Sequence, residues 1–372
     1  MELQTFINNN TDYTSKFREL NLNTKKYGEL GLLIVTYKYD FKYDFDENPF
    51  IKFCKGAIIR LDDNKVICLP VKKCTDKHDL SNCSTDSFNE DNMILQPLLD
   101  GTMINMFYHN DEWFLSTRSY IGAKNKWDQN ISFKKMFEDI VKEKNINFDE
   151  LNKKHSYSFV LQHKENRIIS EIVDNNLIMV QEYSPETFLL QDFEDNIYKS
   201  FTIIKNNDMN VLHDSLNKPF NFQFKGFTIK DNKSFKRINF INSQYQYVFD
   251  IKSKANFNNK LLAFLYLRNN KLLTEYLKYF NDDAKLFDSY RNIVYIMKNE
   301  LHDCYVKYFI KKEIQKKDIP YQLKPVLYEL HTLYKQQQVK ITNEVVNNYI
   351  YVMPIKRLCF ILNYYLNLTI LL

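Results

Sequence analysis

The sequence predicts an α+β fold in which a domain built on antiparallel sheets is followed by an all-helical domain. Up to about residue 257, short segments rich in β-branched and aromatic residues alternate with turns that contain Asp, Asn or Gly, a pattern typical of hairpins. From residue 258, apolar residues recur every three or four positions with few Gly or Pro residues, as in helices. The two patterns together indicate a sheet domain and then a helical one.

The length of the chain favours more than one domain. Its 372 residues exceed the usual size of a single domain. We expect an N-terminal extension packed on the core over residues 1–50, a sheet-rich domain over residues 51–257 and a helical domain over residues 258–372. A hydrophobic fraction of 44% and a charged fraction of 26% are ordinary for a globular protein with a real core. The net charge of +5 favours a polyanionic partner, but only weakly.

The expected elements of the sheet-rich half follow a short helical opening and an apolar stretch at residues 31–45. Two helical segments are expected to interrupt the strands, at residues 124–145, with apolar residues between 131 and 140, and at residues 186–201. The strand-type segments cover residues 56–61, 65–71, 102–108, 112–121, 157–163, 177–183, 224–230 and 245–252.

Cysteine usage predicts a reducing compartment. The six cysteines follow no spacing typical of a small disulfide-bonded domain, and no N-terminal targeting segment is recognisable. A cytoplasmic location is expected, with a viral factory or virion as alternatives. Cys74, His78 and Cys83 are close enough to be considered as zinc ligands, but a fourth ligand is lacking, which favours a polar loop. The apolar stretch 358–372 is interrupted by two asparagines and predicts a packed helix rather than a membrane span.

Residues 98–122, LLDGTMINMFYHNDEWFLSTRSYIG, carry the most informative pattern in the chain. They resemble the opening signature of the covalent nucleotidyltransferases, especially the phage-type ATP-dependent RNA ligases. In that family Lys-x-Asp-Gly is followed across a hairpin by a Thr-Arg-Gly element. Asp100 and Gly101 match the first part, Thr117 and Arg118 match the second, and Ser119 replaces the final glycine.

Four other segments resemble the remaining elements of this family and occur in the same order. Residues 54–74 resemble the strand pair before the signature, with Lys73 at a position that is usually basic. Residues 158–172 resemble the central acidic strand. Residues 225–230 resemble the Glu-Gly-hydrophobic-Val element, and residues 250–254 resemble the terminal Lys-x-Lys element.

The resemblance implies an antiparallel-sheet adenylyltransferase domain of the ATP-grasp-like ligase kind. It also implies a reaction in which a lysine amine attacks the α-phosphate of ATP, after which the adenylate passes to an RNA 5′-phosphate and a 3′-hydroxyl closes the bond. Leu98 stands where the nucleophilic lysine is expected, and no neighbouring register supplies an amine. The covalent step as the family performs it is therefore expected to be absent.

Further departures concern the phosphate and metal sites. Gln162 replaces the central acidic residue, so binding of ATP and Mg²⁺ is expected to be weakened. Lys225 replaces the glutamate before glycine and Asp250 replaces the first lysine of the last element; either the two form an exchanged ion pair, or the alignment is shifted by one residue. The candidates for nucleotide binding, each with a surface or turn role as the alternative, are Asp100, Gly101, Arg118, Gln162, Lys230 and Lys252.

Three functions remain open at this stage. The first is a ligase-like pseudoenzyme that binds nucleotide or nucleic acid, RNA above all, from a large DNA virus in view of its AT-rich codon usage. The second is a divergent active RNA ligase with an amine from elsewhere in the chain, and the third is a structural interaction protein that keeps the fold. Basic residues of the helical domain are expected either to contact RNA backbone or to form a solvated helix face: Lys311, Lys312, Lys316, Lys317, Lys324 and Lys335. No membrane partner is expected, and the oligomeric state is open.

Overall fold

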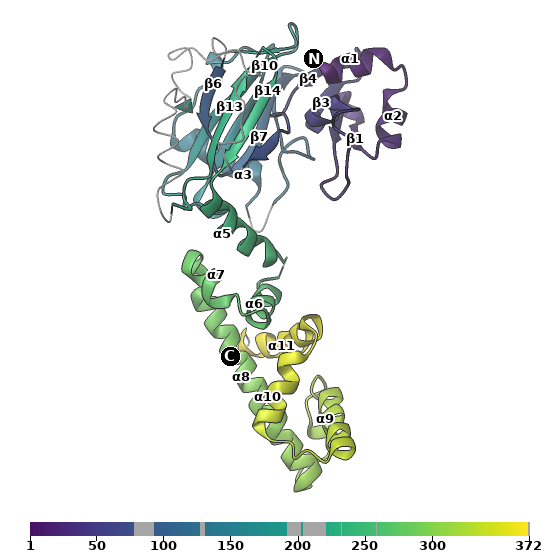
Figure 1. The fold of residues 1–372 in the computed structure, drawn as a ribbon, viewed down its shortest axis with the longest axis vertical. Coiled ribbons are helices and arrows are strands. Elements are labelled where there is room, and N and C mark those ends of the chain that lie inside the picture. Colours follow the sequence, from purple (N-terminus) through teal and green to yellow (C-terminus); the bar gives the residue numbers. More distant parts are fainter. Residues whose placement is uncertain are drawn as a thin grey trace. The chain divides into compact units, whose positions relative to one another are not determined.

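The structure is a computed structural model that describes residues 1–77, 93–126, 131–191, 202–203, 221–231, 233–257 and 259–370. The chain divides into two compact units, Met1–Tyr247 and Val248–Leu372. The first unit combines antiparallel sheets with a few helices and the second is helical (Figure 1). The predicted α+β fold class, with a helical region at the C-terminal end, is confirmed.

Residues 32–36 and 56–59 of the first sheet are buried on both faces. Helices α1 (Glu2–Asn9) and α2 (Tyr13–Glu19) lie beside it (Figure 1). Because alternate residues of a strand point to opposite faces, Leu33 packs in the cluster of α1 and α2, while Leu32 packs with Phe107 from another sheet. The antiparallel strands are, in order, β1 (Asn23–Tyr27), β2 (Leu32–Thr36), β3 (Lys55–Arg60) and β4 (Lys65–Cys68).

The second sheet has one face covered by helix α3 (Phe133–Glu143). Apolar residues of α3, Phe137 and Ile140 among them, are fully buried against strand residues such as Phe159. On the opposite face a smaller cluster contains Val160 and Val180. The strands run in the order β11 (Leu189–Leu190), β10 (Asn176–Ser184), β9 (Ser156–Gln162), β7 (Thr102–His109) and β8 (Glu112–Ser116), with β12 (Thr202–Ile203) parallel to β10.

The third sheet has one apolar and one polar face. Phe227 and Ile229 alternate with Thr228 and Lys230, and register pairing places Arg237 opposite Lys230 on the same face. The face that carries Thr228 and Lys230 therefore presents hydrogen-bonding and basic groups. Its strands run in the order β5 (Thr75–Lys77), β14 (Lys236–Ile241), β13 (Gly226–Asp231) and β6 (Met93–Pro97).

The second unit is built from helices with buried apolar stripes. Phe264, Phe287, Leu301, Leu330 and Leu362 are fully buried. None of the helices in the described residues is long and apolar enough to span a bilayer. The helices are α5 (Ser243–Lys254, which begins in the first unit), α6 (Lys260–Asn269), α7 (Leu273–Tyr279), α8 (Ala284–Tyr305), α9 (Lys324–Gln337), α10 (Asn343–Val352) and α11 (Ile355–Ile370).

Short helical turns complete the chain. They are the 3-10 turns Gly28–Leu30, Pro49–Phe53, Phe148–Glu150, Lys164–Asn166, Asn281–Asp283 and Lys316–Asp318, and the π-helical turn Val306–Ile310.

The strand predicted at residues 245–252 is wrong, because this segment forms helix α5. Apolar residues at 245, 247, 249 and 251 alternate as in a strand. The structure exposes Tyr247 and Phe249 and buries Tyr245, Val248 and Ile251, which recur every three residues, as on one side of a helix. The side chain of Asn242 accepts a hydrogen bond from the Gln244 amide at 2.9 Å, as expected at the start of a helix.

Two other expectations fall partly outside the described residues. Of the helix predicted at residues 186–201, the described part is a turn followed by the short strand β11, with Phe188 in the left-handed region (φ 58°). The remainder lies outside the described residues. His78 and Cys83 of the considered zinc site also lie outside them.

Exchange of Gly226 for alanine should destabilise the first unit. The φ of Gly226 is +137°, and a Cβ atom there would lie 1.9 Å from the Phe240 carbonyl oxygen on the paired strand. Because backbone must move, we expect G226A to lose at least about 2 kcal/mol of unfolding free energy. Chemical denaturation measures this loss. G28A is the matched control, since a Cβ at Gly28 meets nothing within 4 Å; equal stability of the two variants would contradict the geometry.

Candidate functional site

The carboxylate of Asp100 is the centre of a buried hydrogen-bond network. The residue is 4% exposed. Its Oδ2 accepts hydrogen bonds from the amides of Ile169 and Ser170, both at 2.8 Å, and its Oδ1 accepts one from the Tyr245 hydroxyl at 2.6 Å. Burial, and secondarily the Asp100 charge, raise the pKa of Tyr245, so the phenol stays protonated and donates. Asp100 thereby joins the end of β6, the segment after β9 and the start of α5.

Gly101 and Gln162 lie beside this network. A Cβ at Gly101 would be 2.6 Å from the Leu161 carbonyl oxygen, so the chain can pass β9 this closely only with glycine. The side-chain amide of Gln162 donates to the Asp100 carbonyl at 2.8 Å. The structure therefore brings together three of the residues that the sequence predicts, and it uses Gln162 to hold the main chain of Asp100.

Position 98 offers no amine to this site. The Leu98 amide donates to the Gly226 carbonyl at 2.8 Å, continuing the pairing of β6 with β13. The residue that precedes Gly226 is Lys225, and its Nζ lies 3.5 Å from the Leu99 carbonyl oxygen and 4.0 Å from Asp100 Oδ1. An amine from the residue before β13 thus reaches the main chain at positions 99 and 100.

The predicted exchange of charges between Lys225 and Asp250 is wrong. The carboxylate that the structure pairs with Lys225 is Asp100, within the first unit. Asp250 lies on helix α5, where it is exposed, rather than on a terminal strand. The prediction failed because it placed residues 250–254 in the sheet.

Lys55, at the start of β3, is a site residue that the sequence analysis missed. The residue is half-buried as a whole, but its ammonium end is desolvated, and burial lowers its pKa. The positive charges of Arg237, Lys225 and Arg118 lower the pKa further, so these three cations act on Lys55. The only sequence signal is the pair Lys55-Gly56, which is inconspicuous in a chain so rich in lysine.

Arg118 approaches Lys55 because Gly56 has no side chain. A Cβ at Gly56 would lie 2.7 Å from the Arg118 carbonyl oxygen. The Arg118 guanidinium donates to the Tyr37 carbonyl, and its Cζ lies 3.4 Å from the centroid of the Tyr39 ring. Its Nε is buried and has no hydrogen-bond partner among the described residues. A buried donor without a partner is unfavourable unless a ligand completes it.

The remaining predicted site residues are placed differently. Lys230 is 6% exposed, and its Nζ donates to the Val180 carbonyl of the second sheet at 3.3 Å. Lys252 lies on helix α5 in the second unit, with its Nζ 4.8 Å from the centroid of the Phe280 ring. Lys230 is thus an interior residue of the first unit, whereas Lys252 belongs to the helical unit.

The described residues contain few groups that could hold a metal ion together. No three side chains of His, Cys, Asp or Glu converge there as ligands. Both oxygens of Asp100 already accept hydrogen bonds, and Gln162 carries no charge. These groups do not fit a divalent cation held by the protein alone.

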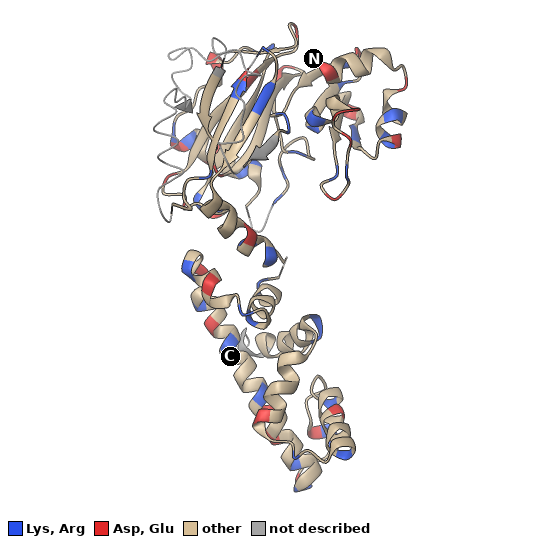
Figure 2. Ribbon diagram, viewed as in Figure 1, with Lys and Arg blue, Asp and Glu red and all other residues tan. Residues whose placement is uncertain are grey.

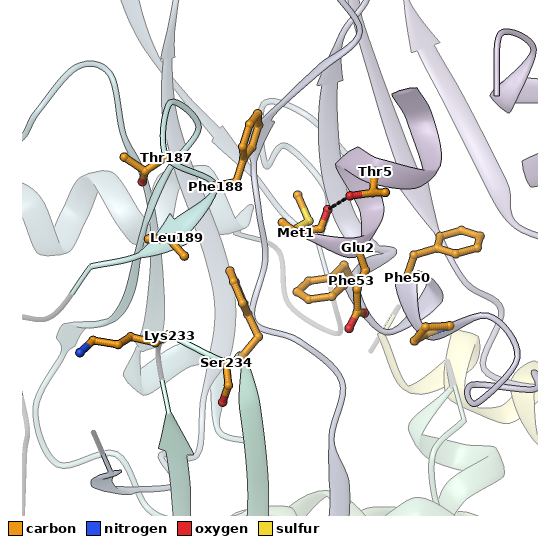
Figure 3. Close-up of a pocket in the computed structure, with 12 residues that line it drawn as sticks. Met1, Glu2, Thr5, Phe50, Phe53, Thr187, Phe188, Leu189, Lys233 and Ser234 are labelled. Atoms are coloured by element: carbon orange, nitrogen blue, oxygen red, sulfur yellow. Dashed lines mark hydrogen bonds between the residues drawn. The ribbon is translucent and has the colours of Figure 1, made fainter. Parts of the chain in front are cut away.

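The first unit also contains a pocket away from the Asp100 network. Its volume is about 530 Å³. It is walled by aromatic rings, including Phe50, Phe53 and Phe188, with Glu2 and Lys233 among its few charged residues (Figure 3). None of the predicted site residues lines it, and we assign it no chemistry.

Comparisons with known proteins add relatives at low identity. No family model matches the sequence. The chain is 24% identical over 268 residues to the "Immediate-early protein ICP-46 homolog" of Invertebrate iridescent virus 6, covering 65% of this chain and 58% of the relative. It thus spans less than two thirds of that relative's length.

Solved structures of ligases are also similar to the chain. One is an archaeal ATP-dependent RNA ligase (TM-score 0.48, 11% identity, 78% of each chain covered). Another is a protein from Aquifex aeolicus described as an ATP-dependent DNA ligase (TM-score 0.46, 14% identity, 75% of this chain and 80% of that chain covered).

Removal of the Asp100 carboxylate should destabilise the first unit strongly. Asp100→Ala leaves two backbone amides and the Tyr245 hydroxyl without their acceptor, so we expect a loss of about 3 kcal/mol or more. Tyr245→Phe removes a single bond and should lose about 1 kcal/mol. Urea unfolding measures both. Asp40→Ala, at an exposed position, is the control, and a loss at Asp100 no larger than that at Asp40 would refute the central role of the network.

Replacement of Lys55 should stabilise the free protein. The folded-state pKa of Lys55 is lowered from 10.5, so its charged form destabilises the folded state below the folded pKa, and the effect fades as the pH rises toward 10.5. Lys55→Met should therefore raise the melting temperature at neutral pH in phosphate-free buffer, with a smaller gain at higher pH. Lys142→Met, at an exposed position, is the control. A gain that grows with pH would contradict the assignment.

Proposed function

We propose that this protein is an RNA-ligase-like, nucleotidyltransferase-type protein that binds the phosphates of a nucleotide or of RNA without forming a lysine adduct at position 98. One observation carries the proposal: Arg118, Lys225 and Arg237 bring positive charge to the buried ammonium of Lys55, and the Arg118 main chain lies against the neighbouring Gly56. Lys55 and Arg118 form no ion pair with any described carboxylate, and Lys225 reaches only Asp100. A polyanion supplies the missing charge.

The polar face of the third sheet supports the same ligand. Thr228, Lys230, Arg237 and Asn239 share that face. The Thr228 hydroxyl and the Lys230 ammonium donate to the Ile238 and Val180 carbonyls, so Arg237 is the cation of this face that the proposal uses. Arg237 donates from Nε to the Asn239 side chain at 3.3 Å, which orients the guanidinium along the strand. The guanidinium groups of Arg118 and Arg237 and the ammonium groups of Lys55 and Lys225 are suitable donors to phosphate oxygens.

The proposal that catalysis is impaired rests on two missing features: an amine at position 98 and a cluster of metal ligands among the described residues. Leucine at position 98 has no lone pair for attack on a phosphate, and the described residues offer no cluster of metal ligands. Binding of a nucleotide in this protein would rely on protein cations, with a divalent ion in a minor role. This is the behaviour of a pseudoenzyme.

A divergent active ligase is the second candidate, and the position of Lys225 favours it. In this alternative Nζ of Lys225 attacks the α-phosphorus of ATP; the new P–N bond forms as the bond to the bridging oxygen breaks, pyrophosphate leaves, and the amine proton passes to solvent. The neighbouring cations would stabilise the departing charge. Asp100, 4.0 Å from this amine, would position it.

Incubation with α-labelled ATP and Mg²⁺ or Mn²⁺ separates the two candidates. The pseudoenzyme predicts no acid-stable labelled protein, together with salt-sensitive binding of ATP and single-stranded RNA. Lys55→Met combined with Lys225→Met should weaken that binding about tenfold. Lys142→Met combined with Lys144→Met removes the same charge from exposed positions and is the matched control.

The other outcomes reject the proposal in distinct ways. A labelled band that survives acid and disappears in Lys225→Arg establishes the active ligase. Equal loss of binding in both double variants indicates non-specific attraction. Absence of binding to ATP and to RNA leaves the structural interaction protein.

A further inference from the structure

We infer that a basic pocket in the helical unit binds one phosphate-bearing nucleotide unit of a single-stranded nucleic acid. The pocket has a volume of about 240 Å³, smaller than the roughly 300–1,000 Å³ of sites that enclose a whole small-molecule ligand. It lies within the second unit and shares no residue with the Asp100 site. The residues that line it are Phe264, Arg268, Arg291, Val294, Lys298, Asn347 and Tyr351.

Three cations and no carboxylate line this pocket. Arg291 and Lys298 stand seven residues apart on helix α8, which places them on the same side of the helix. Arg268 enters from α6. Arg291 pairs with Asp288, which lies outside the lining, whereas Arg268 and Lys298 form no ion pair with the described carboxylates. Such a pocket attracts an anion.

Arg268 supplies the strongest argument for a bound anion. Its guanidinium donates to the Asn269 side chain at 3.1 and 2.9 Å, and burial lowers its pKa. A desolvated guanidinium without a carboxylate is unfavourable until an anion approaches. Lys298 donates to Asn347 at 2.8 Å, which holds the ammonium at the rim of the same pocket.

The aromatic and amide groups indicate a base next to the phosphate. Tyr351 is 41% exposed, and its hydroxyl is anchored to the Asn269 carbonyl at 3.4 Å. An exposed aromatic ring beside cations is the arrangement with which proteins stack bases and hold the backbone of a single strand. Phe264 and Val294 form an apolar floor.

This pocket differs from the basic helix faces that the sequence suggested. Figure 2 shows basic and acidic residues interspersed along α8 and α9, so the helices carry no uniformly basic surface. Three cations without a carboxylate are found at the pocket, whereas the helices around it carry both charges. It also stands independently of the function proposed for the first unit.

The test measures binding of a short labelled single-stranded RNA to the full chain by fluorescence anisotropy over a range of salt. Arg291→Gln combined with Lys298→Gln should weaken binding about tenfold and flatten the dependence of log K on log salt by roughly one phosphate contact. The matched control is Lys285→Gln combined with Lys356→Gln, which removes two exposed charges from α8 and α11.

Tyr351→Ala should weaken binding about tenfold. Tyr295→Ala, which removes an exposed ring from α8, should leave binding unchanged.

Competition identifies the source of the phosphate. AMP and inorganic phosphate are titrated into the wild type and the pocket variant. If the variant loses AMP or phosphate binding but keeps RNA binding, a strand is not the occupant and the inference is overturned. Equal effects of the two double variants, or no effect of either, overturn it as well.

Two further measurements keep the result interpretable. Circular dichroism of each variant reports whether the helices are intact, and Arg291→Lys, which keeps the charge, should retain most of the RNA binding. If the function proposed for the first unit is wrong, the Lys55 and Lys225 variants bind RNA as the wild type does, while the pocket variants still lose binding. The two proposals can therefore fail separately.

Discussion

The first unit depends on the buried carboxylate of Asp100. Four hydrogen-bonding or charged partners from three segments converge on it: the amides of Ile169 and Ser170, the Tyr245 hydroxyl and, more loosely, the Lys225 ammonium. A carboxylate that accepts several bonds is stable in its charged form even when solvent is excluded. This one carboxylate holds the main chain at positions 98–101, where Gly101 lies against β9, and it also holds the start of α5. Asp100 therefore has a structural role in the first unit.

Around that anion the first unit holds more positive charge than it neutralises. Lys55, Arg118 and Lys225 come from different parts of the sequence, and the absence of a side chain at Gly56 lets the Arg118 main chain approach β3 closely. Folding therefore places like charges together, which is unfavourable for the free protein. Binding sites commonly accept such a loss of stability because the ligand restores the balance.

The sequence predicted the general architecture better than the site. Alternation and turn residues identified most strands, and glycine and aspartate at positions 100–101 marked the turn that the structure confirms. The prediction for segment 245–252 failed because Tyr245, Tyr247, Phe249 and Ile251 alternate as in a strand, whereas the residues that the structure buries recur every three positions, as in a helix. Lys55 and Lys225 could not be recognised as neighbours, because their proximity depends on sheet order and on close backbone contacts that no local pattern encodes. The partnership of Lys225 with Asp100 rather than Asp250 follows from the same non-local geometry.

The division of the chain after Tyr247 has a practical consequence for spectroscopy. The protein has two tryptophans, Trp113 and Trp127, and both precede that division. Tryptophan emission therefore reports only on the first unit, whereas the far-ultraviolet dichroism signal is weighted toward the helices of the second. When the two signals are followed during heating, curves that do not coincide would reveal separate melting of the units. A single optical probe would hide it.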